Sequence, residues 1–231
     1  MNTPVELLYF SDILCVWAYA GQIRLDELRR NFGDQVLIRH RFIAVFGNTE
    51  QRIGAAWKDR GGYAAYAEQV REVARQFPHV RLSPDTWTRC VPRTSLTAHL
   101  FIKALQRLEA AGNLPAASGE AGATVVEAFI WRARCAFFEQ AQDIGSLPVL
   151  FDLAAEMGLP RDPVKALLDD GTALADLAWD MEQKERLRLE GSPSYVLNEG
   201  RQKLYGNVGY RVLEANIREL LEHPGGQASW C

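Results

Sequence analysis

Residues 5–19 have the sequence VELLYFSDILCVWAY, and this stretch decides the fold. Val5–Phe10 is short and apolar and stops at the turn-forming pair Ser11-Asp12, which is typical of a buried β-strand. A helix is expected to begin at about Cys15 and to end at Gly33, because apolar residues follow at near-helical spacing and glycine favours a helix C-terminus. A cysteine therefore stands where a strand gives way to a helix.

Elements further along the chain extend this unit. Residues 36–42 are rich in β-branched and aromatic side chains with charges at alternate positions, so a second strand is predicted there. After Gly191-Ser192-Pro193, the stretches 194–198 and 202–206 flank a glycine-containing turn and predict a β-hairpin. An amphipathic helix follows and is expected to end at 223–226. The predicted order is β-α-β at the start of the chain and β-β-α at its end.

The region from about residue 48 to residue 189 has a helical pattern almost throughout. Apolar residues recur at helical spacing in 63–77, 96–108 and 129–137. Ser146 and Asp162 stand just ahead of first-turn prolines and are predicted to cap helices. The Gly/Ala/Ser-rich stretch 112–122 is predicted to link two helices.

These patterns together predict a single α/β unit. Neither half of the sheet can bury its two faces alone, so the halves must pair with each other. We expect residues 1–48 and 190–231 to form this unit and residues 49–189 to form an all-helical insertion.

The composition is that of an ordinary globular protein, with 48% hydrophobic and 24% charged residues among 231. The net charge of −3 gives no reason to expect nucleic acid or an anionic membrane as a partner. Charges interrupt every apolar run before the roughly 20 residues that a membrane-spanning helix needs. The N-terminus lacks the basic and apolar segments of a secretory signal, so a cytoplasmic location is expected.

The cysteines restrict the chemistry further. There are four of them, Cys15, Cys90, Cys135 and Cys231, and no two have the spacing of a zinc site or a Cys-x-x-Cys motif. The four histidines show no metal-ligand spacing either, so no metal is expected. A reducing compartment would keep these thiols free. Cys135 lies in an apolar helical stripe and is predicted to be a core residue, and Cys231 is predicted to be free at the C-terminus.

Three stretches resemble a known family. Residues 11–19 resemble the Asp-x-x-Cys-Pro-Trp-Cys-Tyr segment of cytosolic DsbA-like (FrnE-like) proteins, with Ala18 in place of the second cysteine. Residues 136–144 resemble that family's Ala-x-Phe-x-x-x-x-Asp-Ile stretch, and 191–195 its Gly-x-Pro-x-Phe/Tyr strand start. The resemblance covers nearly the whole chain in the right order. It implies a thioredoxin fold with inserted helices, and a dimer in many relatives.

The same branch includes 2-hydroxychromene-2-carboxylate isomerases and kappa-class glutathione transferases. Their Asn-Ser/Thr-x-x-Ala helix start is answered by 94–98, where Thr94 replaces the asparagine. Their Gly-x-Asp-Arg segment is answered by 206–211, which contains Asn207 and Arg211 but lacks the aspartate. The resemblance implies that these three residues are candidates for binding glutathione, as a co-substrate rather than as a tightly bound cofactor.

Cys15 is the predicted catalytic residue. A thiol at a helix N-terminus faces free backbone N–H groups and the positive end of the helix dipole, which favour the thiolate and lower the pKa. The thiolate is the nucleophile of disulfide exchange. Because Ala18 replaces the resolving cysteine, release of the product needs an outside thiol, unless Cys90 resolves the intermediate.

The sequence leaves three functions open. The first is a thiol-disulfide oxidoreductase with one nucleophilic cysteine, acting on a protein or small-molecule substrate. The second is a glutathione-dependent transferase or isomerase, and the third is a thioredoxin-fold binding module. Pro193 is predicted to follow a cis peptide bond that lets Ser192 offer its backbone to an extended substrate beside Cys15. Asp12 and Trp17 are expected to shape the site, Asp12 through the turn and Trp17 through packing.

Overall fold

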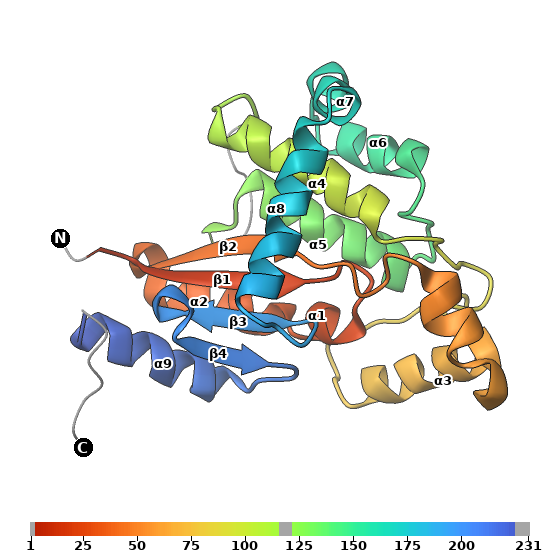
Figure 1. Ribbon diagram of the computed structural model, residues 1–231, viewed down its shortest axis with the longest axis horizontal. Coiled ribbons are helices and arrows are strands. Elements are labelled where there is room, and N and C mark those ends of the chain that lie inside the picture. The colour runs from red at the N-terminus through yellow and green to blue at the C-terminus, as the bar shows by residue number, and fades with distance from the viewer. Residues whose placement is uncertain (1–2, 116–121, 225–231) are drawn as a thin grey trace.

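A mixed four-stranded sheet forms the centre of the computed structural model, which describes residues 3–115 and 122–224 (Figure 1). The strand order is β2-β1-β3-β4. The strands are β1 (Val5–Ser11), β2 (Val36–Phe42), β3 (Ser194–Leu197) and β4 (Gln202–Tyr205). The predicted β-α-β and β-β-α halves therefore join in one sheet, and the α/β thioredoxin-like fold is confirmed.

The register brings the two ends of the chain together. β1 pairs in parallel with β2 from Val5 opposite Val36 to Ser11 opposite Phe42. β3 pairs antiparallel with β1, with Tyr9 opposite Tyr195, and β4 pairs antiparallel with β3. Because β1 ends at Ser11 and its antiparallel neighbour β3 begins at Ser194, the segments that contain Cys15 and Pro193 meet at the same end of the two central strands.

The predicted helix from Cys15 to Gly33 consists of two helices, α1 (Val16–Ala20) and α2 (Gln22–Phe32). They meet at Gly21, where a Cβ atom would lie only 2.9 Å from the Trp17 carbonyl oxygen. The final helix is α9 (Tyr210–Glu222). Helices α2 and α9 pack their apolar residues against β1 and β3 and form a core of their own.

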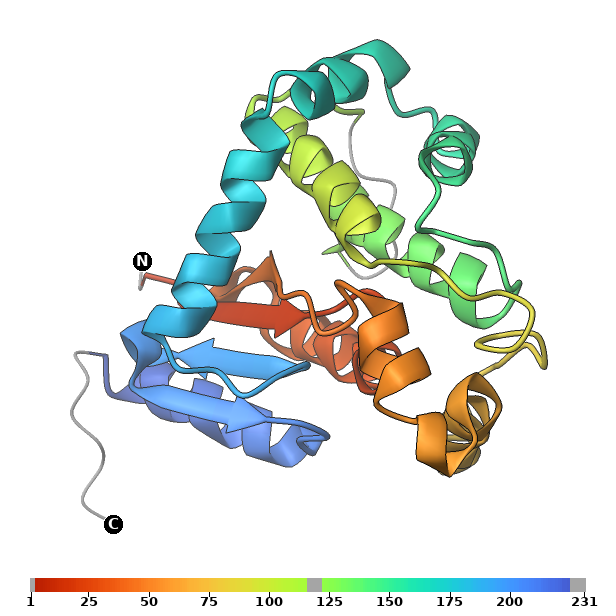
Figure 2. The same cartoon turned by 45° about the vertical axis from the view of Figure 1, so that its right-hand side comes forward.

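The insertion is mostly helical, and its α4–α8 block lies on the other side of the sheet from α9 (Figure 2). Its α-helices are α3 (Gly62–Arg75), α4 (Leu96–Ala110), α5 (Val125–Phe138), α6 (Leu147–Glu156), α7 (Arg161–Asp169) and α8 (Thr172–Arg186). A short π-helix (Glu50–Ala55) and a 3-10 turn (Lys58–Arg60) precede α3.

Two local predictions for the insertion are wrong, and a third holds for position only. Residues 76–95 contain no helix and are held by turns around a bridge between Thr86 and Cys90. Asp162 lies inside the first turn of α7, because Pro160 already occupies the N-cap position. Ser146 does occupy the N-cap of α6, but its side chain makes no capping hydrogen bond.

The largest hydrophobic cluster joins the insertion to the first half of the sheet domain. It contains residues of the Cys15 turn and α1 together with residues of α3, α4, α5 and α8. Part of the predicted 112–122 linker and Cys231 lie outside the described residues. Within the described ranges, no helix is both long and apolar enough to cross a membrane.

Candidate active site

Cys15 lies at the N-cap of α1, where β1 has turned into the helix. Its Sγ donates a hydrogen bond to the Ser192 carbonyl oxygen over 3.4 Å. The Ser192 hydroxyl oxygen in turn accepts a hydrogen bond from the Asp12 backbone N–H over 2.8 Å. The peptide bond between Ser192 and Pro193 is cis, which confirms that prediction. The structure thus brings together Cys15 and Ser192, which are 177 residues apart in the chain.

The prediction of a lowered pKa for Cys15 is wrong. Burial raises the pKa of this thiol above its ordinary value, and the negative charge of Asp12 adds to the increase. The side-chain hydroxyl of Ser192 and the backbone N–H groups of Ala18 and Trp17 favour the thiolate and act in the opposite direction, without cancelling burial. Cys15 is only 5% exposed. The loss of hydration therefore raises the pKa of its thiol more than the N-terminus of the five-residue helix α1 lowers it.

Asp12 connects the cysteine turn to two other segments. Its carboxylate accepts hydrogen bonds from the backbone N–H of Leu14 (2.9 Å), the backbone N–H of Phe46 (2.8 Å) and the hydroxyl of Ser95 (2.8 Å). Burial raises its pKa to about 6, although these three hydrogen bonds oppose the change. Asp12 therefore shapes the site as predicted, because it holds the turn before Cys15 against the loop at 43–46 and the N-terminal end of α4.

His99 supports the same turn from α4. Its Nε2 accepts a hydrogen bond from the backbone N–H of Ile13 over 3.1 Å, and its ring stacks on Phe42. Burial, helped by the positive charges of Arg134 and Lys103, lowers its pKa to about 3. The imidazole is therefore neutral and serves as an acceptor. This role of His99 is not predictable from the sequence, because an isolated histidine within a helical stripe carries no signal for this contact.

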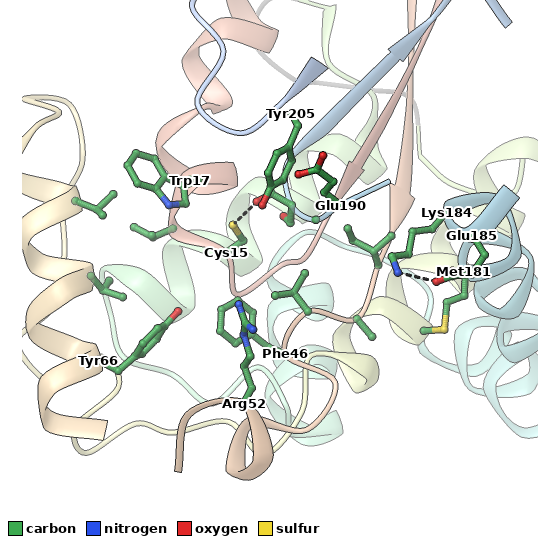
Figure 3. Close-up of a pocket in the computed structure, with 18 of the residues that line it drawn as sticks. Cys15, Trp17, Phe46, Arg52, Tyr66, Met181, Lys184, Glu185, Glu190 and Tyr205 are labelled. Carbon is green, nitrogen blue, oxygen red and sulfur yellow. Dashed lines mark hydrogen bonds and ion pairs between the residues drawn. The ribbon is translucent and has the colours of Figure 1, made fainter. Parts of the chain in front are cut away.

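Cys15 opens onto a cavity of about 1020 Å³ between α1, α3, α8 and the loop at 43–46 (Figure 3). Aromatic and aliphatic side chains line most of it, among them Trp17, Phe46, Trp57, Tyr66 and Met181. Trp17 also packs edge-to-face on Phe77, so this residue both lines the site and stabilises it, as predicted. A cavity of this size and apolar character suits a small organic molecule.

The remaining predicted residues divide into two groups. Ala18 is fully buried one helical turn after Cys15, and Ser192 lines the cavity. Cys90 does not line it: burial raises its pKa to about 11, and its charged neighbours are Asp143 and Asp85 rather than the site. The structure therefore gives no support to Cys90 as the resolving thiol.

Cys135, predicted to be a core residue, is only half-buried on α5. Burial raises its pKa to about 12, with the carboxylate of Glu139 adding to the increase. The three described cysteines all carry free thiols. Of these, Cys15 alone lines the cavity.

The three candidates for binding glutathione also lie outside the cavity lining. The hydroxyl of Thr94 accepts a hydrogen bond from the backbone N–H of Leu96, the first residue of α4. Asn207 and Arg211 are exposed near the start of α9.

Several residues of the cavity wall were missed. Arg52 and Tyr66 face the cavity from the π-helix and α3, and Tyr205 and Glu190 border it near Cys15 (Figure 3). Tyr66 belongs to an apolar stripe whose spacing predicts only packing, and nothing in the local sequence marks Arg52. Among the described residues, no cluster of three metal-ligating side chains occurs.

Comparison with known proteins agrees with this geometry. No curated protein sequence matches the chain. A candidate protein disulfide isomerase from Nitrosomonas europaea has a similar structure, with a TM-score of 0.74 and 14% identity over 96% of this chain and 100% of its own. The cytosolic disulfide reductase DsbM from Pseudomonas aeruginosa has a TM-score of 0.61 and 20% identity over 92% and 98%.

A third similar structure is a 2-hydroxychromene-2-carboxylate isomerase, with a TM-score of 0.61 and 16% identity over 94% of this chain and 96% of its own. At these identities the neighbours show the fold alone. The family model of the DSBA-like thioredoxin domain matches residues 6–218, which is nearly the whole chain. The chain therefore belongs to the DSBA-like thioredoxin domain family.

Proposed function

We propose that the protein is a thiol-disulfide oxidoreductase that works through the single thiol of Cys15. The observation that carries this proposal is the position of Cys15, which is the described cysteine that lines the cavity and contacts Ser192 ahead of Pro193. Membership of the DSBA-like family supports the reaction class. The absence of a cysteine at position 18 supports a mechanism with one thiol.

Cys15 takes part in two exchange steps. The Cys15 thiolate attacks one sulfur of a bound disulfide, forms a mixed disulfide and expels the other half as a thiolate. Ala18 has no thiol with which to resolve this intermediate. An external thiolate therefore attacks the mixed disulfide on the substrate's sulfur, which returns Cys15 as a thiolate and releases that half of the substrate as a mixed disulfide with the external thiol. A second molecule of the external thiol frees the remaining substrate thiol and leaves as its own disulfide.

Glutathione is the external thiol that we propose, with a cytoplasmic location to match. DsbM from Pseudomonas aeruginosa has been solved with GSH, and that structure covers 92% of this chain with a TM-score of 0.61. Glutathione is also abundant enough in a reducing compartment to drive the second step. We propose no tightly bound cofactor.

A glutathione-dependent isomerase or transferase is the second candidate. The aromatic cavity favours it, because Trp17, Trp57 and Tyr66 would pack well against the ring of a small aromatic substrate. In that case Cys15 would bind or contact the substrate without forming a disulfide. The two candidates differ in whether Cys15 changes its oxidation state during turnover.

Turnover of a small disulfide separates the candidates. We expect the protein to catalyse the reduction of bis(2-hydroxyethyl) disulfide by glutathione, and we expect Cys15→Ser to abolish this activity. Cys90→Ser is the matched control and should retain it, since Cys90 lies outside the cavity. Equal activity of the wild type and Cys15→Ser would refute the proposal.

A further inference from the structure

Two polar side chains face Cys15 across the cavity and have no side-chain partner among the described residues. The hydroxyl of Tyr66 and the guanidinium of Arg52 both reach into the cavity on the side of Cys15 opposite Glu190 and Tyr205 (Figure 3). Neither group makes a side-chain hydrogen bond or ion pair with any residue of 3–115 or 122–224. Both are therefore free to bind a ligand.

Three aromatic rings hold Tyr66 in place. Trp57 and Trp87 pack edge-to-face on it, with ring centroids 5.2 Å and 5.5 Å away, and Phe46 lies at 6.2 Å. Trp87 is itself fully buried. The direction of the hydroxyl is thus set by packing before any substrate arrives, which lowers the entropic cost of using it.

The charges around Tyr66 decide what its hydroxyl can do. Burial raises the pKa of Tyr66 well above its usual range, and the nearby Cys15 and Asp12 raise it further, while Arg52 acts in the opposite direction. This sensitivity to Cys15 places the hydroxyl within the electrostatic reach of the reacting sulfur. The phenol keeps its proton wherever a thiol is ionised, so it is a hydrogen-bond donor and not a base.

We propose that Tyr66 is a catalytic residue that donates a hydrogen bond to the sulfur leaving a disulfide attacked by Cys15, and that Arg52 stabilises the negative charge formed there. This inference rests on the proposed exchange function. Because the leaving sulfur of an in-line attack lies across the bound disulfide from the cysteine, it comes to the wall that carries these two groups. The other polar residues of the lining are Gln69 on α3, the α8 residues Glu182, Lys184, Glu185 and Arg186, and Glu190, Ser192 and Tyr205.

The first exchange needs no reactant besides the thiolate of Cys15 and the bound disulfide. The Cys15 thiolate forms a bond to the nearer sulfur, the original S–S bond breaks, and its electron pair stays on the farther sulfur. Tyr66 donates a hydrogen bond to that new thiolate and keeps its proton. The external thiol of the second exchange supplies the electrons that reduce the substrate overall.

A hydroxyl donor beside a guanidinium also favours one class of substrate. A leaving thiolate of low pKa needs little help, whereas a basic alkyl thiolate carries concentrated charge and gains most from a donor and a cation. We therefore assign the cavity to small disulfides whose leaving group is an alkyl thiol, above all one that carries a carboxylate within reach of Arg52.

The test compares leaving groups in two matched variants. Tyr66→Phe removes the hydroxyl and keeps the ring. Tyr63→Phe is the control, because Tyr63 lies on the same helix, outside the main cavity, and its hydroxyl donates to Glu50. Single-turnover rates of Cys15 mixed-disulfide formation are measured for a series of small disulfides whose leaving thiols range from aromatic to alkyl.

We expect Tyr66→Phe to slow exchange with alkyl disulfides by roughly 10- to 100-fold, the effect of losing a hydrogen bond to a charged group. Aromatic disulfides should lose less than about threefold, so the rate depends more steeply on the leaving thiol's pKa. Tyr63→Phe should keep the wild-type dependence. Arg52→Gln should slow carboxylate-bearing alkyl disulfides more than neutral ones.

The outcomes separate this inference from the proposed function. If Tyr66→Phe and Tyr63→Phe show the same dependence as the wild type while Cys15→Ser is inactive, the role of Tyr66 is refuted and the exchange function stands. If the wild type forms no mixed disulfide at Cys15 with any member of the series, the proposed function fails and takes the inference with it.

Discussion

At the scale of single residues, Cys15 is a nucleophile whose reactivity must depend steeply on pH. Burial raises the pKa of its thiol, so only a small fraction is ionised near neutral pH. We expect its rate of alkylation by iodoacetamide to rise with pH up to pH 9 or beyond, by about tenfold per pH unit. Mass spectrometry of labelled peptides checks this. A rate that levels off below about pH 7 would show a lowered pKa instead.

Cys15 should also be alkylated before Cys90 and Cys135. It opens onto the cavity, where a small reagent can reach the thiol, whereas Cys90 and Cys135 lie outside the cavity lining. Preferential labelling of either of these thiols in the folded protein would contradict the assignment of Cys15.

The charge of Asp12 raises the pKa of the Cys15 thiol. Its pKa is raised to about 6, so at pH 7.5 it is largely ionised and its charge disfavours the Cys15 thiolate. We expect Asp12→Asn to move the pH dependence of Cys15 alkylation to lower pH. The amide NH₂ would face at least one of three donors, so the free energy of unfolding should fall by about 1–3 kcal/mol. An unchanged alkylation profile in a folded variant would remove Asp12 from this role.

The sequence predicts the site residues that belong to a contiguous pattern. Cys15 stands at a strand-to-helix turn, and Ser192-Pro193 stands before a strand, so both positions follow from local signals. Tyr66, Arg52 and His99 could not be found in this way. Their roles arise from the packing of inserted helices against the cysteine turn, which no local spacing encodes.

At the scale of elements, a cysteine introduced into α1 tests whether position 18 is where a resolving thiol would act. Ala18 is one turn from Cys15 on the same side of α1, since residues i and i+3 are neighbours. We expect Ala18→Cys to form a disulfide with Cys15 under oxidising conditions and to reduce insulin faster than the wild type with a thiol reductant. Ala18 is fully buried, so the added sulfur should cost about 1–3 kcal/mol of stability.

The control for this gain is the double change Cys15→Ser with Ala18→Cys, which should lack it. A folded Ala18→Cys variant that forms no disulfide with Cys15 would show that position 18 is not where a resolving thiol acts.

The strands and helices are largely predictable where apolar residues keep one spacing, that of a strand or that of a helix, along the whole element. β2 was predicted with its observed bounds, because β-branched residues and alternating charges agree along its length. The break at Gly21 and the loop at 76–95 were not. The first depends on the approach of the Trp17 carbonyl and the second on hydrogen bonds such as that from the Ser83 N–H to Phe138, which join distant segments.

At the scale of the whole molecule, the stability should respond to the protonation of His99. This residue joins α4 to the cysteine turn, and its pKa is lowered to about 3 in the folded protein. Between pH 3 and 6.5 the unfolded chain therefore binds more protons than the folded one at this site. The contribution of His99 to stability is full above its unfolded pKa and is lost as the pH falls.

We expect the difference in unfolding free energy between wild type and His99→Gln to shrink by on the order of 3 kcal/mol from pH 7 to pH 4. Urea unfolding at the two pH values measures it. The raised pKa of Asp12 makes its own contribution to stability grow as the pH falls, which is opposite to that of His99. The unfolding free energy of the wild type is therefore compared with that of His99→Gln at each pH. A difference that is the same at both pH values would contradict a neutral, buried His99.

The account depends most on one claim, that Cys15 alone forms the mixed disulfide and cannot resolve it within the protein. The direct test is to incubate the reduced protein with glutathione disulfide and map the modified cysteine by peptide mass spectrometry under non-reducing conditions. We predict a single glutathione adduct on Cys15 that persists until free glutathione is added. An adduct that bypasses Cys15, or one replaced spontaneously by an internal disulfide, would contradict the account.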